Sequence, residues 1–431
     1  MTAIVGILNK QGVALAADSA VTLGQGEKIL LSANKLFTLS KHWPVGIAIF
    51  GNAEFLGVPW EVIIKDYRAK RNDAKHDTLE LFALDFLAYL RNEHSLFPED
   101  AQRSHFEMTV DGYFMAFWDR LDKAIRGAFS DGHQPTDKDV LDMANSMIER
   151  EHGMWSNAPL TDGFDPQRDA VVRPKYAALV EQVIKDIFEK FPFTKESMDK
   201  LVDIGIWLSY RRPKGMGAPG DSGVVIAGYG QKDIYPKLRS FMLFGLLDGV
   251  LNYAPDRTVD ISTDVNATIV PFAQSEMVTT FMEGMDPMLS QTLENELGKI
   301  FEQLPDAIVG SVSTIDAEVG SSLSEALKKA TKGFMDRYRQ GLKKYQQEKF
   351  VMPVIHMVGA LPKDELASMA EALVNLTSFK RHVSRQAETV GGPIDVAVIS
   401  KGDGFIWIKR KHYFDPKLNH HFLANYFSAQ E

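Results

Sequence analysis

The first eighteen residues constrain the fold more than any other segment. Two apolar runs, Thr2 to Leu8 and Val13 to Asp18, alternate with period two and flank a turn at residues 10–12. This pattern predicts an antiparallel β-hairpin. Few polar residues interrupt either run, so we expect both faces of these strands to be covered, as in two sheets packed between helical layers.

The middle and the far end of the chain predict further strands. Residues 222–230 (SGVVIAGYG) and 236–243 (PKLRSFML) read as a strand pair. Residues 395–399 and 405–408 read as a hairpin, whose turn is Gly402-Asp403-Gly404. These segments extend the β framework of the N-terminus to the other end of the chain.

Two long stretches have helical rather than strand periodicity. The first runs from about Ala74 to Arg212 and the second from about Phe281 to Gln347. Within the first, Thr136 and Thr194 have the side chain and position expected of helix starts. We therefore divide the chain into a β-rich core and two helical insertions, with these boundaries: 1–73, 74–212, 213–280, 281–350 and 351–431.

Composition excludes several classes of function. The formal net charge is -9 and no basic stripe is present, which argues against nucleic acid as a main partner. The chain has no cysteine, so thiol nucleophiles, disulfides and thiolate metal sites are excluded. No apolar run approaches the ~20 residues of a membrane-spanning helix, and no signal peptide is recognisable. We expect a cytoplasmic protein that does not bind membranes.

Three short motifs have simpler explanations than cofactor, protease or metal chemistry. The glycine pattern of residues 215–220 follows a predicted helix and precedes a strand, the reverse of a dinucleotide-binding fold. The tetrad at 220–223 resembles that of serine proteases, but the region before it is helical where that fold needs β-barrels. The pair His420-His421 is too short a cluster for a metal site. We expect neither a cofactor nor a metal.

Thr2 is the first candidate for catalysis. Removal of Met1 would leave a hydroxyl nucleophile and a free α-amine on the same residue, and the amine has a pKa of about 7.7–8. Such an amine can accept and return a proton near neutral pH. The simpler alternative is that Thr2 only begins a strand, as in most chains that start Met-Thr.

Three segments together carry a resemblance to a known family. They are SANKLFTL at 32–39, VGIAIFGNAEFLG at 45–57, where a strand breaks at Gly51-Asn52 and opens a helix, and VGGPIDVAVISKGDGFIWIKR at 390–410. With the N-terminal hairpin, they resemble proteasome β-type subunits, which are N-terminal nucleophile hydrolases and threonine peptidases. The resemblance implies an α+β fold, a four-layer αββα sandwich, to which the helical insertions add a lobe.

The resemblance also implies roles for individual residues. Thr2 would be the nucleophile and its α-amine the base, while Asp18 and Lys35 stand where the family has its acid and its lysine. A main-chain N–H at Ala48 would stabilise the oxyanion, and Ser275 would belong to the support shell. The simpler alternatives are a strand-end turn acid for Asp18 and a solvated side chain for Lys35.

The support shell departs from the family pattern. Ala387 and Val390 stand where the family has an aspartate and a serine, and Glu388 is the only nearby acid. We expect a threonine endopeptidase that cleaves peptide bonds of peptides or proteins through an acyl-enzyme and self-associates into a ring or related homo-oligomer. The alternatives are a catalytically inactive, partner-binding scaffold and an amidase for small amides. An ATP-driven unfoldase as partner stays open.

Overall fold

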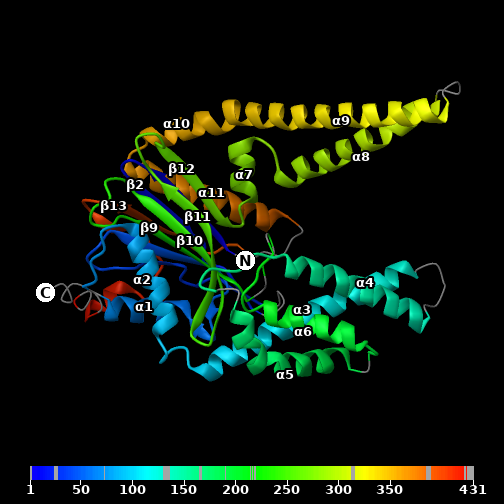
Figure 1. Ribbon diagram of the computed structural model, residues 1–431. Coiled ribbons are helices and arrows are strands. Elements are labelled where there is room, and N and C mark those ends of the chain that lie inside the picture. The colour runs from blue at the N-terminus through cyan, green and yellow to red at the C-terminus, as the bar shows by residue number, and fades with distance from the viewer. Residues whose placement is uncertain are drawn as a thin grey trace. The chain divides into compact units, whose positions relative to one another are not determined.

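The computed structural model divides the chain into two compact units (Figure 1). The first unit contains residues 1–36, 260–400 and 406–431, and the second contains residues 37–259 and 401–405. The described residues are 2–23, 28–71, 73–129, 136–164, 167–189, 191–213, 215, 217, 220–311, 316–384, 390–421 and 424.

The first unit is built on a five-stranded sheet. In order across the sheet, its strands are β12 (Ala267–Ala273), β1 (Ala3–Asn9), β2 (Gly12–Ala17), β13 (Asp395–Ser400) and β14 (Gly404–Lys409). The pairs β1–β12, β1–β2 and β2–β13 are antiparallel. A separate two-stranded ribbon joins β3 (Val21–Leu23) and β4 (Lys28–Leu30).

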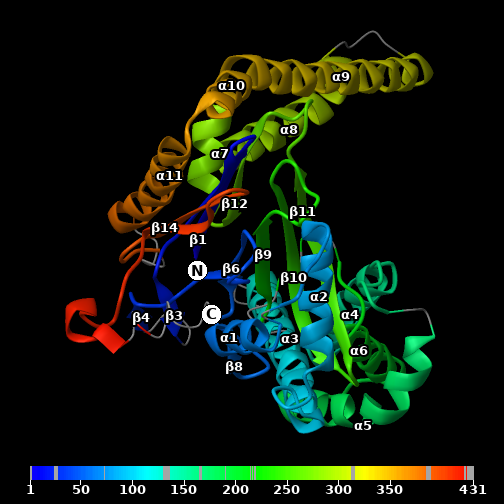
Figure 2. The ribbon, with the colours of Figure 1, turned by 90° about the vertical axis from the view of Figure 1, so that its left-hand side faces the viewer.

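Two helices pack on this sheet. Helix α11 (Lys363–Val383) lies against β1, β2 and β13, and α10 (Met352–Ala360) lies against β12 (Figure 2). Val5 of β1 and Val396 of β13 share one buried apolar cluster with Leu373 and Val374 of α11. Residues on the alternate positions of these strands, such as Leu15, are buried as well. The expectation that both faces of these strands are covered is therefore confirmed.

A long helical segment precedes α10 in the first unit. It comprises α7 (Glu276–Glu283), α8 (Pro287–Ser311) and α9 (Ala317–Gln346), and one π-helical turn, η1 (Gln347–Val351), joins α9 to α10. Helices α8 and α9 pack on each other and converge away from α7 (Figure 1). A short 3-10 turn, η2 (Pro416–Leu418), lies near the C-terminus.

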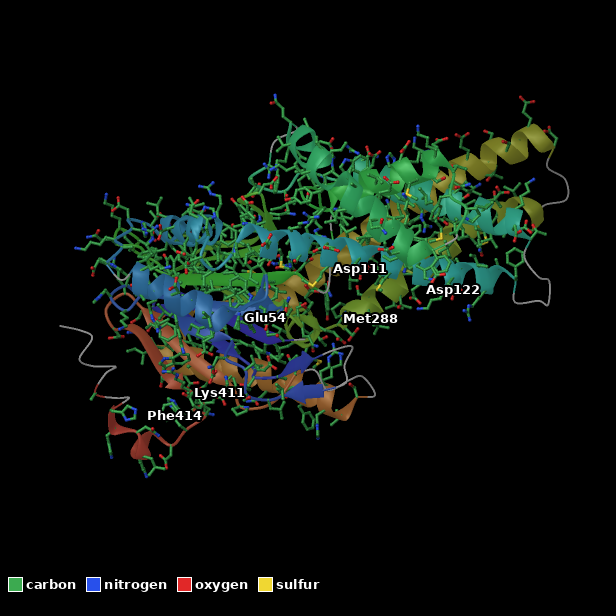
Figure 3. The ribbon with its side chains drawn as sticks, turned by 90° about the horizontal axis from the view of Figure 1, so that it is seen from below. Glu54, Asp111, Asp122, Met288, Lys411 and Phe414 are labelled. Carbon is green, nitrogen blue, oxygen red and sulfur yellow. The ribbon has the colours of Figure 1, made fainter. Side chains whose placement is uncertain are left out.

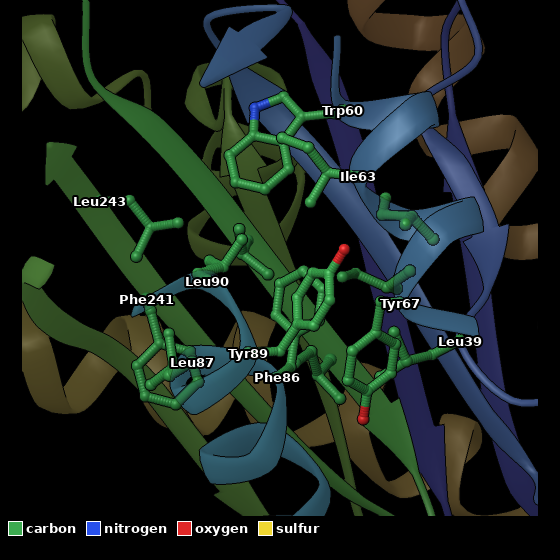
Figure 4. Close-up of a cluster of buried hydrophobic side chains, with 14 of the residues drawn as sticks. Leu39, Trp60, Ile63, Tyr67, Phe86, Leu87, Tyr89, Leu90, Phe241 and Leu243 are labelled. Carbon is green, nitrogen blue, oxygen red and sulfur yellow. The ribbon is translucent and has the colours of Figure 1, made fainter. Parts of the chain in front are cut away.

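The second unit has its own five-stranded sheet. Its strands, in order, are β11 (Val250–Asp260), β10 (Lys237–Leu247), β9 (Ser222–Gly228), β6 (Val45–Gly51) and β5 (Leu36–Thr38). Helices α1 (Trp60–Lys70) and α2 (Leu79–Asn92) share one apolar core with this sheet. In this core, Tyr67 packs edge-on against Phe86 and Tyr89 (Figure 4).

Four more helices of the second unit share a separate core. They are α3 (Glu99–Ala128), α4 (Asp137–Ser156), α5 (Arg168–Phe188) and α6 (Lys195–Trp207). Trp155 is fully buried there, and its indole N–H donates to the Tyr113 hydroxyl at 2.7 Å. Within residues 74–212, α2 thus belongs to the sheet core and α3–α6 to their own. The division into core and insertions stays a prediction.

Several local predictions are confirmed. The hairpins β1–β2 and β13–β14 and the pair β9–β10 lie where the sequence indicates. Thr136 caps α4 in a capping box, and the Thr194 side chain accepts from the Ser197 N–H at the start of α6. The coarse class is confirmed as a mixture of helices and antiparallel sheets.

One local prediction is wrong. The sequence predicts that the chain turns from β6 directly into a helix at Gly51-Asn52. Instead, a two-stranded ribbon of β7 (Glu54–Phe55) and β8 (Val58–Pro59) intervenes, and α1 begins at Trp60. Leu56 and Gly57 both have positive φ, so they form a tight turn that cannot continue a helix.

Candidate active site

Thr2 directly precedes β1, beside the residue that follows β12. Its carbonyl accepts a hydrogen bond from the Gln274 N–H at 3.1 Å, one residue after the pair Ala3–Ala273. The residue is only 4% exposed. The edge of the sheet thereby holds the backbone of Thr2 in place, while Met1 lies outside the described residues.

Asp18 follows β2 directly and is fully buried. Its Oδ1 accepts from the Ala3 N–H at 2.9 Å and from Lys35 Nζ at 2.7 Å. Its Oδ2 accepts from the N–H groups of Ala20 and Gly391, both at 3.1 Å. A carboxylate is an acceptor only, and this one has four donors, which satisfies the main requirement for burying a charge.

Lys35 is buried and forms the ion pair with Asp18. Burial lowers the pKa of the Lys35 ammonium below its usual range, because desolvation disfavours the charged form. The Asp18 carboxylate opposes this effect, and the positive charge of Lys411 adds to it. Lys35 Nζ and the Ala3 N–H share Asp18 Oδ1, so Lys35 lies no more than two hydrogen-bond lengths from the peptide that follows Thr2.

A second buried carboxylate lies one strand away. Asp395 begins β13 opposite Ala17, the residue before Asp18. It accepts from the Lys411 backbone N–H at 2.8 Å, and Lys411 Nζ forms an ion pair with its other oxygen. Lys411, labelled in Figure 3, lies just beyond β14. Sequence reasoning missed this pair. The signal was an acid at the start of an otherwise apolar strand, since a buried charge requires a partner.

Residues 391–393 attach the start of β13 to Asp18 and Ser19. The Ser19 N–H donates to the Gly391 carbonyl at 3.1 Å, and the Ser19 hydroxyl donates to the Pro393 carbonyl. Gly392 has φ +77°, and a Cβ there would lie 2.9 Å from the Leu31 carbonyl oxygen. This position therefore requires glycine.

The expected support residues differ in where they lie. Ser275 is the N-cap residue of α7, with no capping bond from its side chain, and it directly follows Gln274. Ala48 lies in β6 of the second unit, opposite Val225, with its side chain fully buried. Their roles stay predictions. Val390 is buried, whereas Ala387 and Glu388 lie outside the described residues.

Near Thr2, the described residues make a series of polar side-chain contacts that the sequence did not reveal. Arg381 of α11 donates from Nε to the Gln274 side-chain oxygen at 2.7 Å and contacts Glu276. Because Gln274 also binds the Thr2 carbonyl through its backbone, α11 is connected to the N-terminus. Across the described ranges, no group of three or more His, Cys, Asp or Glu side chains is placed to hold a metal ion.

Comparison with known proteins gives structural neighbours only. No family model and no curated protein matches the chain. Solved structures to which the chain is similar include an Anbu (Gly-1) mutant from Hyphomicrobium sp. strain MC1 (TM-score 0.28, 10% identity, 100% of this chain and 94% of that chain). They also include Anbu (ancestral beta-subunit) from Yersinia bercovieri (0.28, 10%, 99% and 95%) and the helical assembly of the Anbu complex from Pseudomonas aeruginosa (0.27, 10%, 99% and 95%).

Among the described helices, none combines the length and the apolar character needed to cross a membrane.

Proposed function

We propose that this protein is a proteasome-like threonine hydrolase that cleaves peptide bonds through an acyl-enzyme on Thr2. One observation carries the proposal. The buried Asp18 carboxylate joins the Lys35 ammonium to the peptide N–H directly after Thr2. Burying an ion pair has a desolvation cost, and a buried, hydrogen-bonded pair beside a candidate nucleophile is typical of sites where charge serves chemistry.

The proposed reaction needs only groups of this chain and water. After removal of Met1, the α-amine of Thr2 accepts the hydroxyl proton as Thr2 Oγ attacks the peptide carbonyl. The C–N bond of the tetrahedral intermediate breaks, and the ammonium returns its proton to the departing amine. Water, deprotonated by the same amine, then attacks the ester carbon. The bond from that carbon to Thr2 Oγ breaks, the ammonium returns the proton to Oγ, and the acid leaves.

Lys35 supplies electrostatic stabilisation in this scheme. A positive charge near Thr2 favours the deprotonated hydroxyl and the oxyanion, and its effect is larger in a site with little water. The lowered pKa of Lys35 also allows it to exchange a proton more readily than an exposed lysine would. Asp18 acts through Lys35 by holding the ammonium in place.

The remaining features of the proposal follow from the resemblance to proteasome β-type subunits. They are the four-layer αββα arrangement, the oxyanion donor at Ala48, the support role of Ser275, and self-association that encloses Thr2. A cytoplasmic location and peptide or protein substrates belong to the same proposal.

Removal of Met1 and labelling of Thr2 test the proposal. Intact mass should show loss of Met1, and a β-lactone or epoxyketone probe should label one site at Thr2. Thr2→Ala should abolish labelling, whereas Thr2→Ser should keep it, because serine retains both hydroxyl and amine. Thr268→Ala in β12 of the same unit is the matched control and should label as the unmodified protein does. Equal labelling of the Thr2→Ala variant would refute the proposal.

The low exposure of Thr2 favours two alternatives. A catalytically silent scaffold would react with no probe of any size, and retention of Met1 would favour it. An amidase for small amides would react with small activated amides and not with peptide probes. A panel of acyl probes of increasing size therefore separates a peptidase from both alternatives.

A further inference from the structure

Helices α8 and α9 form an antiparallel hairpin. Glu294 pairs with Arg339 near one end, and Asp306 pairs with Lys328 near the other. Pro305 of α8 and Met335 of α9 are buried, which identifies the sides on which the two helices contact each other.

Each helix also exposes a stripe of large apolar side chains. On α8 the stripe recurs at spacings of four and seven residues, and on α9 at four and eleven. At roughly 100° per residue, each stripe spans an arc of no more than about 100°. The members are Leu289, Leu293, Ile300, Leu304 and Ile308 on α8, and Val319, Leu323, Phe334 and Tyr345 on α9.

Helical geometry places the two stripes on the same side of the hairpin. Each helix is viewed down its axis from its own N-terminus. The centre of the α8 stripe is then rotated by roughly 110° from Pro305. The centre of the α9 stripe is rotated in the same sense, by roughly 80° from Thr331 and roughly 120° from Met335. For antiparallel helices, equal senses of rotation point to one side. The nine side chains therefore form a single surface, which we call the hairpin face.

The hairpin face has the dimensions of a stable interface. Helix α8 has 25 residues, which makes it about 38 Å long at 1.5 Å per residue. Two helices side by side, each about 9 Å wide, give about 700 Å² per copy, so a face-to-face pair would bury about 1,400 Å². This area lies in the standard range for specific protein–protein interfaces.

Charge selects the partner and its orientation. Helix α8 has four acidic residues and one lysine, whereas α9 has seven basic and three acidic residues. A two-fold axis parallel to the helices places each α8 opposite the α9 of the other copy. Each acidic helix then has a basic helix both beside it and across from it, whereas the other face-to-face orientation would oppose like charges.

We propose that the hairpin face binds the hairpin face of a second copy of this chain, with α8 over the partner's α9 in a four-helix arrangement. This dimer goes beyond the proposed hydrolase, because it requires no chemistry at Thr2. It also identifies a surface for self-association that involves neither five-stranded sheet.

Light scattering on the full chain tests the dimer. Ile300 is 55% exposed, so Ile300→Glu should leave the fold intact, as circular dichroism would verify. It places an unpaired charge in the interface and should raise the dissociation constant at least about tenfold. The matched control is Ile234→Glu, which changes an exposed isoleucine of the second unit and should leave the mass unchanged. A monomeric unmodified chain, or equal masses for both variants, would overturn the proposal.

Disulfide cross-linking tests the orientation, since the chain has no cysteine of its own. Ile300 and Phe334 lie at similar heights along the hairpin, as the pairs Glu294–Arg339 and Asp306–Lys328 imply. A mixture of Ile300→Cys and Phe334→Cys chains should give mixed cross-linked dimers under mild oxidation. Cross-linking confined to Ile300→Cys alone would place α8 over α8 and contradict the charge argument.

A lipid surface is the competing occupant of this face. Sedimentation with phosphatidylcholine vesicles containing phosphatidylserine should show no binding of the unmodified chain. Binding that Ile300→Glu removes, without a change in oligomeric mass, would assign the face to membranes and overturn the dimer.

Discussion

The candidate active site and the α8–α9 hairpin belong to the same unit but distribute their side chains in opposite ways. Around Asp18, charged groups are buried and every carboxylate oxygen has donors. On the hairpin face, large apolar groups are exposed to solvent. Each region departs from the usual rule of apolar inside and polar outside. Hydrogen bonds offset the cost of burying the charges around Asp18, whereas the exposed apolar side chains of the hairpin face require another surface to cover them.

Two identical substitutions sharpen the contrast between buried and exposed acids. Asp18→Asn removes the counter-charge of a buried lysine and should lower the free energy of unfolding by about 3–5 kcal/mol. Asp306→Asn removes the partner of Lys328 on the exposed hairpin and should leave stability within measurement error. Chemical denaturation of both variants measures the difference. Equal losses of unfolding free energy would mean that burial does not determine how much the Asp18–Lys35 pair contributes to stability.

A second pair of variants compares apolar contacts in the two regions. Leu373→Ala removes a buried side chain of α11 from the core against the first sheet and should cost about 2–4 kcal/mol. Ile300→Ala shortens an exposed side chain and should change the stability of the dissociated chain by no more than about 0.5 kcal/mol. Denaturation at low protein concentration separates this effect from dimer dissociation. A large loss for Ile300→Ala under those conditions would show that the hairpin face is covered within one chain.

The sequence predicts the strands better than the contacts that form the site. Period-two alternation and turn residues locate β1–β2 and β13–β14, because these signals are local. The pair Asp18–Lys35 was anticipated only through family resemblance, since nothing local connects residues seventeen positions apart. The pair Asp395–Lys411 was missed. Its partners meet because β13 lies beside β2 and the chain returns along β14, which depends on strand order.

The exposed apolar stripes of the hairpin illustrate a second limit of prediction from the sequence. Helical periodicity predicts that residues 281–347 are largely helical, and four helical segments lie in or across this range. The mixed charges of this stretch predict a solvated or partner-facing helix, but periodicity alone does not distinguish a buried apolar face from an exposed one. The structure makes that distinction, because α9 has one set of residues against α8 and a second set facing solvent.

The smallest expected effect is on how the free energy of unfolding depends on pH, to which two lysines should contribute with opposite signs. Burial lowers the pKa of Lys35, so the unfolded chain, with a lysine pKa of about 10.4, binds this proton more tightly than the folded chain. The Lys35 contribution to stability should therefore rise with pH between its lowered pKa and about 10.4. The measurement is the difference in unfolding free energy between the unmodified chain and Lys35→Met, from neutral pH upward.

Lys380 is the matched control for that measurement. Its hydrogen bond to Glu276, aided by Asp286, raises the pKa of the Lys380 ammonium, so the folded chain holds this proton more tightly. Its contribution should be fully present below about 10.4 and should fall as pH rises above that value. The difference curve for Lys380→Met should therefore slope downward where that for Lys35→Met has stopped rising. Two curves of the same sign would show that burial does not dominate the environment of Lys35, and would weaken its assigned role beside Thr2.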